Sequence, residues 1–103
     1  MGATAVGGTS VRRTVIVANP PDGLHMRPAT AFAKLARGFR CAVVVRNGEK
    51  VADGRSPHEL IMLFAPPGTE LLLELDGDDA DIALDSLAAI LTATDDDDPA
   101  AGS

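Results

Sequence analysis

The sequence is poor in aromatic residues: its 103 residues include three Phe, no Trp and no Tyr. A protein that binds single-stranded nucleic acid would lack the rings on which bases stack. Positive charge is also scarce, because nine Lys and Arg stand against fifteen Asp and Glu and leave a net charge of −6. Since a phosphate backbone is bound by a basic surface, we expect no nucleic-acid partner.

Cysteine and long apolar segments are scarce too. The single cysteine, Cys41, excludes an intrachain disulfide and a cysteine-based metal cluster. Its place in the run CAVVV predicts a small buried side chain rather than a reactive thiol. No segment approaches the roughly 18 apolar residues of a membrane span, and the N-terminus lacks the apolar stretch of a signal peptide. We therefore expect a cytoplasmic protein without membrane insertion.

What the sequence does contain is enough apolar material, 46% of residues, for one packed core. Residues 1–12 are rich in Gly, Thr, Ala and Ser, which predicts a flexible N-terminal tail. Residues 95–103 include four consecutive Asp, whose mutual repulsion predicts an acidic, disordered C-terminal tail. A single domain is expected to occupy residues 13–94.

The apolar pattern predicts seven elements of secondary structure. Runs of β-branched or alternating apolar residues indicate strands at 13–19, 40–46, 50–53 and 69–77. Apolar residues at helical spacing indicate helices at 26–37, 56–65 and 78–92. An Asn-Gly pair after the second strand predicts a hairpin, and Leu71, Leu73 and Leu75 share one face of the last strand. The order β-α-β-β-α-β-α indicates an α+β fold, a four-stranded antiparallel sheet with three helices on one face.

The segment GLHMRPA, residues 23–29, places a histidine and an arginine at a predicted helix start. The amides of Met26, Arg27 and Ala29 are expected to lack intrahelical partners. Free amides and the positive end of the helix dipole favour an anion, and the Arg27 guanidinium suits phosphate oxygens. These features predict a phosphate-binding site.

The histidine in this segment, His25, can be interpreted in three ways. The helix dipole disfavours a protonated ring, so a neutral, nucleophilic imidazole beside a phosphate site could carry a phosphoryl group on nitrogen. Alternatively, His25 is an ordinary surface residue that caps the helix. A third interpretation is an anion-binding domain with no covalent step. The residues alone leave all three open.

The segment GLHMRPATAF resembles the phosphorylation site of HPr, the histidine-containing phosphocarrier of the phosphoenolpyruvate-dependent sugar phosphotransferase system. The resemblance extends over residues 13–92 and includes NGEKV at the hairpin and GTELLLELDG in the last strand. It implies the family's open-faced β-sandwich. It also implies a phosphoryl carrier rather than a turnover enzyme, with no metal and no cofactor.

The resemblance implies a role for each matching residue. His25 would accept a phosphoryl group on Nδ1 from enzyme I, which takes it from phosphoenolpyruvate, and would pass it to an enzyme IIA domain during sugar uptake. Met26, Arg27 and Ala29 would hold the phosphate. We expect the protein to act as a monomer. The alternative is an HPr-like regulatory protein whose phosphorylation state controls a kinase or a transcription regulator without transport.

Ser56 corresponds to the family's regulatory serine, the target of HPr kinase/phosphorylase. The pattern Ser56-x-x-Glu59 by itself predicts a capping box at a helix start. Pro57 and His58 stand where the family commonly has an apolar pair, so capping and regulation both remain open for Ser56. Phe64 also departs from the family, which commonly has glycine there.

Met26 and the residues from Leu60 to Phe64 lie near the predicted site in the sequence. Their apolar side chains predict either a small docking patch for partner proteins or part of the core.

Overall fold

The computed structural model describes residues 9–18 and 23–92, and it contains all seven predicted elements in the predicted order. In chain order they are β1 (Thr9–Ile16), α1 (Met26–Arg37), β2 (Cys41–Asn47), β3 (Lys50–Asp53), α2 (Pro57–Ile61), β4 (Glu70–Gly77) and α3 (Ala80–Thr92). The predicted C-terminal tail, residues 95–103, lies outside the described residues.

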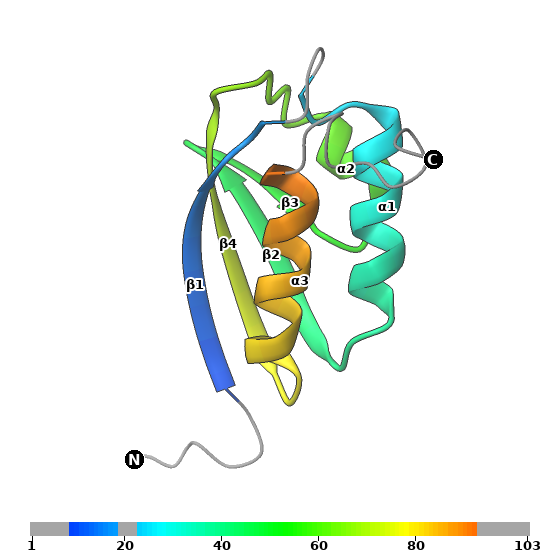
Figure 1. The fold of residues 1–103 in the computed structure, drawn as a ribbon, viewed down its shortest axis with the longest axis vertical. Helices are drawn as coiled ribbons and strands as arrows, with labels where there is room; N and C mark the ends of the chain where they lie inside the picture. Colours follow the sequence, from blue (N-terminus) through cyan, green and yellow to red (C-terminus); the bar gives the residue numbers. More distant parts are fainter. Residues whose placement is uncertain (1–8, 19–22, 93–103) are drawn as a thin grey trace, which may run out of the picture.

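The four strands form one antiparallel sheet with the order β1-β4-β2-β3. The three helices lie on one side of this sheet and leave its other face open (Figure 1). The predicted α+β open-faced sandwich is therefore confirmed. Among the described residues, no helix has the length and apolar character needed to cross a bilayer.

The core lies between the sheet and the helices. Leu71, Leu73 and Leu75 are at most 1% exposed, so they face the helices, as their alternation in the sequence predicts. α1 contributes one fully buried stripe, and α3 covers the β1 and β4 half of the sheet with another. No charged or polar residue is buried in the described part of the chain, so every titratable group there except the Cys41 thiol lies at or near the surface.

β1 begins earlier than the sequence predicts, and this corrects the proposed N-terminal tail of residues 1–12. Residues 9–12 pair with residues 74–77 of β4. β4 has eight residues and provides partners along the whole of β1; a composition rich in Ser and Thr does not reveal that these partners exist. Residues 1–8 lie outside the described part. At its other end β1 stops at Ile16 rather than at 19, although the Val17 amide still donates to the Thr69 carbonyl at 2.9 Å.

α2 is shorter than the predicted helix over residues 56–65, because it ends at Ile61. Two features explain the early end. Phe64 has a left-handed backbone with φ of +52°, which no α-helix can contain. Ala65 precedes Pro66, and a residue before proline is excluded from the helical region. Both features lie inside or beside the apolar run that suggested a longer helix.

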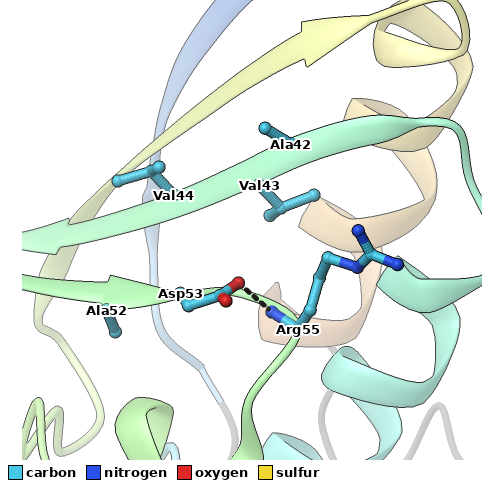
Figure 2. Close-up of a pocket in the computed structure, with 6 residues that line it drawn as sticks. All are labelled: Ala42, Val43, Val44, Ala52, Asp53 and Arg55. Carbon is cyan, nitrogen blue, oxygen red and sulfur yellow. Dashed lines mark hydrogen bonds between the residues drawn. The ribbon is translucent and has the colours of Figure 1, made fainter.

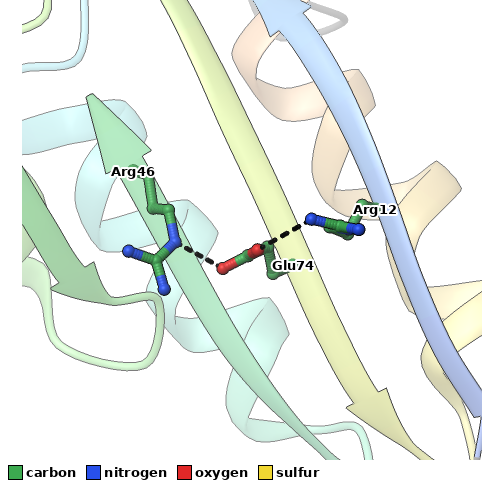
Figure 3. Close-up of polar contacts among 3 residues, drawn as sticks. All are labelled: Arg12, Arg46 and Glu74. Carbon is green, nitrogen blue, oxygen red and sulfur yellow. Dashed lines mark hydrogen bonds and ion pairs between the residues drawn. The ribbon is translucent and has the colours of Figure 1, made fainter. Parts of the chain in front are cut away.

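The open face of the sheet carries a row of three charged side chains (Figure 3). Glu74 of β4 lies between Arg46 of β2, at 2.5 Å, and Arg12 of β1, at 3.7 Å. Arg12 is the direct cross-strand partner of Glu74, and Arg46 lies diagonally across from it, so the three side chains project from the same face. The row joins three strands across the face that no helix covers.

Candidate functional site

His25 is the N-cap residue of α1, as the sequence predicts. Its backbone is extended, with φ of −104° and ψ of −164°, and α1 begins at the next residue. Within the described part of the chain its side chain makes no capping hydrogen bond, and the residue is only half-buried. The ring is therefore not engaged as a helix cap, and the residue is partly open to solvent.

The backbone before His25 is fixed against the segment that follows α2. The Leu24 amide donates to the Ala65 carbonyl at 2.8 Å, and Leu24 is 3% exposed. Gly23 has φ of +72°, and a Cβ atom there would lie 2.2 Å from the Ala65 oxygen. Only glycine fits both the dihedral angle and the space. Gly23 and Leu24, which the sequence interpretation did not single out, thus set the position of His25.

The first turn of α1 corrects one expectation about the phosphate-binding residues. The Ala29 amide, expected to lack an intrahelical partner, donates to the His25 carbonyl at 2.9 Å, because Ala29 is the first residue with a carbonyl four positions earlier at the cap. Ala29 is also 0% exposed, so its role is to pack the helix start. Pro28 has no N–H. Met26 and Arg27 occupy the first two helical positions, where amides point out of the helix end, and both residues are exposed.

The charges around the site are segregated between two helices. α1 contains Arg27, Lys34 and Arg37 and no acidic residue. α3 contains Asp81 and Asp85 and no basic residue. The helix that His25 caps is therefore a positive surface in a protein whose net charge is −6, which favours an anionic ligand or an acidic partner at this helix.

Ser56 caps α2, and its oxygen accepts a hydrogen bond from the Glu59 amide at 3.3 Å. The predicted capping box is only half formed, because the Glu59 carboxylate accepts from the Asp53 amide at 2.9 Å instead of from Ser56. The Ser56 amide donates to the Asp53 carbonyl at 3.0 Å. Two acidic residues thus border the serine that the family resemblance marks as a regulatory position.

The apolar residues from Leu60 to Phe64 divide between the two predicted roles. Leu60 and Leu63 are buried, and Ile61 packs partly against the core. Met62 is 51% exposed and Phe64 is 62% exposed. Met26 is exposed as well, so part of this apolar set belongs to the core and part lies on the surface, where docking of a partner stays a prediction.

A pocket lies beside the end of β3 (Figure 2). Its lining comes from β2, β3 and the turn that follows: Ala42, Val43, Val44, Ala52, Asp53 and Arg55. In Figure 2 the Asp53 carboxylate faces the backbone amide of Arg55, which donates to it at 2.9 Å, while the Arg55 guanidinium points away. None of the predicted site residues lines this pocket. In the described part of the chain, no cluster of three or more His, Cys, Asp or Glu could hold a metal ion.

The sequence from β1 to α3 matches one known protein family. The family described as PTS HPr component phosphorylation site (PTS-HPr) matches residues 11–93. The chain belongs to the HPr family of phosphocarrier proteins. The match begins within β1, extends through α3 and includes His25.

Individual HPr relatives agree with this assignment. The phosphocarrier protein NPr of Shewanella violacea is 39% identical over 85 residues, which cover 82% of this chain and 92% of that protein. The solved structure of HPr from Bacillus anthracis str. Ames has a TM-score of 0.75 at 28% identity and covers 80% of this chain and 96% of that one. The multiphosphoryl transfer protein of Xanthomonas campestris is 39% identical over 71 residues, 69% of this chain, but the chain spans only 8% of that protein's length.

Proposed function

We propose that His25 accepts a phosphoryl group on Nδ1 from phosphorylated enzyme I and passes it to an enzyme IIA domain. Membership of the HPr family supports a phosphocarrier, and the observation that carries the assignment to His25 is its position as a half-exposed N-cap residue whose side chain makes no capping hydrogen bond among the described residues. An imidazole that makes no capping hydrogen bond at the positive end of a helix suits nucleophilic attack on a phosphoryl group.

The transfer step forms one bond and breaks one. The Nδ1 lone pair attacks phosphorus, while the bond between phosphorus and the donor's atom breaks and its electron pair stays with the donor. Transfer onward repeats the same exchange in the opposite sense. The amides at the start of α1 and the Arg27 guanidinium would lower the energy of the negative charge on the phosphoryl oxygens during both steps. The Leu24–Ala65 hydrogen bond would keep the ring at this position.

We propose that Ser56 is a structural cap rather than a regulated site. Its oxygen already accepts from the Glu59 amide, and Pro57 at the first helical position has no amide to offer a phosphate. A phosphate there would add negative charge beside Asp53 and Glu59, both of which hold the loop before α2. These contacts do not favour HPr kinase/phosphorylase as a partner.

The test is incubation with phosphoenolpyruvate and a purified enzyme I, followed by mass spectrometry of the intact protein. We expect one added phosphoryl group on the wild type, labile in acid and stable in base, and none on His25→Ala. His58→Ala is the matched control, because His58 is the other histidine and is exposed on α2; it should be modified like the wild type. An adduct that survives His25→Ala would refute the assignment.

A second incubation separates transport from regulation. Addition of a purified enzyme IIA domain should remove the phosphoryl group from the protein and label the IIA domain. If enzyme I labels His25 but no IIA domain accepts the group, the regulatory alternative is favoured over sugar uptake.

A further inference from the structure

Phe64 combines two features that oppose folding without an evident structural gain. Its φ of +52° is a left-handed conformation that bulky side chains rarely adopt. Its ring is 62% exposed, so burial in the core does not compensate for the strained backbone. Strained conformations of this kind persist where surrounding structure enforces them, and they are concentrated at functional sites.

The surrounding structure does enforce this conformation. On one side, the Asn47 side chain donates to the Leu63 carbonyl at 2.8 Å, which ties the residue before Phe64 to the β2–β3 hairpin. On the same hairpin, the Lys50 ammonium lies 4.6 Å from the centre of the Phe64 ring, a cation–π contact. Phe64 is therefore an exposed residue whose backbone is tied to the hairpin and whose ring has a contact on one side, so a partner would have less of it to order on binding.

Phe64 also lies close to the proposed phosphoryl site. Ala65, the next residue, accepts the hydrogen bond from Leu24, which immediately precedes His25. Two other exposed apolar side chains lie near these residues in the sequence: Met26 follows His25, and Met62, the C-cap residue of α2, lies two positions before Phe64. Two cations accompany these apolar side chains: Lys50 lies against the Phe64 ring, and Arg27 follows Met26 in the sequence. An aromatic ring accompanied by apolar neighbours and cations matches an apolar pocket bordered by carboxylates.

We propose that Phe64 is a specificity-determining contact residue, an exposed aromatic anchor that enters an apolar pocket bordered by carboxylates on enzyme I, the protein proposed to donate the phosphoryl group to His25. This inference rests on the proposed function of His25. Phe64 does not touch the reacting atoms; it selects the protein that brings them. It therefore acts on association with the partner and leaves the chemical step unchanged.

The test measures phosphoryl transfer from labelled enzyme I, taken from the same genome as this chain, at a series of protein concentrations. Phe64→Gly and Phe64→Asn both remove the ring, and both replacements tolerate the left-handed backbone, so they should fold with a Tm no lower than about 5 °C below the wild type. We expect both to lower kcat/KM about tenfold, with the loss in KM. Ile82→Ala is the matched control, because Ile82 is 65% exposed on α3; its rate should equal that of the wild type.

Two results would overturn the proposal: variants of Phe64 that transfer at the wild-type rate, or a loss confined to kcat. Neither result affects the assignment of His25, which fails only if the wild type is not phosphorylated or if His25→Ala still is.

Discussion

The Leu24 amide and the Ala65 carbonyl oxygen lie 2.8 Å apart in a hydrogen bond, and this contact positions His25. It joins the loop before α1 to the segment after α2, two parts of the chain that are far apart in sequence. Because Leu24 is also buried, the residue before the histidine is held both by the backbone and by its side chain. The backbone next to His25 is thus held in a fixed position.

Gly23→Ala should disturb the contact between Leu24 and Ala65. A Cβ atom at Gly23 would lie 2.2 Å from the Ala65 oxygen, in addition to the strain of a φ of +72°. We expect a loss of about 3 kcal/mol in the free energy of unfolding, from the sum of dihedral strain and overpacking, together with slower phosphorylation. Gly48→Ala is the control, because Gly48 has φ of +61° with no atom within 4 Å of the added Cβ; it should lose about 1 kcal/mol. Urea unfolding measures both, and equal losses would contradict the close approach.

Arg27→Ala tests the cation at the start of α1. The variant should still become phosphorylated, because the ring and the helix end remain, but transfer from enzyme I should slow about tenfold once the charge-assisted contact to the phosphoryl oxygens is lost. Rapid-quench measurement of labelled protein gives the rate. Lys34→Ala removes a positive charge from the last turn of the same helix and should have a smaller effect. Equal rates for the two variants would show that Arg27 contributes only its positive charge and not a specific contact to the phosphoryl oxygens.

Ser56→Ala tests the cap of α2. Loss of the hydrogen bond from the Glu59 amide should lower the free energy of unfolding by about 1 kcal/mol, seen as a drop of several degrees in Tm. Ser56→Asp should retain most of the stability, because aspartate is also a good N-cap residue. If Ser56→Ala is as stable as the wild type, the capping hydrogen bond of Ser56 does not contribute to the free energy of unfolding.

The Cys41 thiol gives the fold a pH dependence of known sign. Burial, followed by the nearby Asp79 carboxylate, raises the pKa of Cys41, and Arg55 opposes this. The ordinary pKa of this thiol is 9.0, so above that pH the unfolded state loses its proton first. Stability is therefore complete below this value and falls as the pH rises through the folded pKa.

Urea unfolding from about pH 7 to about pH 10 measures this loss. Cys41→Ala should remove that part of the slope, although it should also lower stability at all pH values because a buried side chain is shortened. A slope unchanged by the substitution would assign the pH dependence to other groups.

The spacing of apolar residues in the sequence correctly predicted the bounds of α1 and the buried face of β4. α1 begins and ends where its apolar spacing and Gly38 predict, and the buried face of β4 follows from its alternating leucines. The start of β1 could not be predicted in this way, because residues 9–12 are strand only through pairing with β4. The predicted end of α2 was wrong for a similar reason. The residues after the helix are held by contacts that are distant in sequence: Asn47 of the hairpin bonds to Leu63, and Leu24 bonds to Ala65.

The candidate site shows the same division. His25 and Arg27 could be found from the sequence because a helix start and its charges are local features. The packed role of Ala29 and the close contact at Gly23 required the structure, since both depend on neighbours in space. The glycine before the histidine was visible in the sequence, but nothing there indicated that its missing side chain makes room for Ala65.

The three basic residues of α1, with no acidic residue in that helix, create a positive potential next to His25. Within about 8 Å, the Debye length at physiological ionic strength, an acidic surface exerts a torque that turns this helix toward itself before any atoms touch. Collisions would then begin with the histidine already facing the partner, and added salt would randomise them.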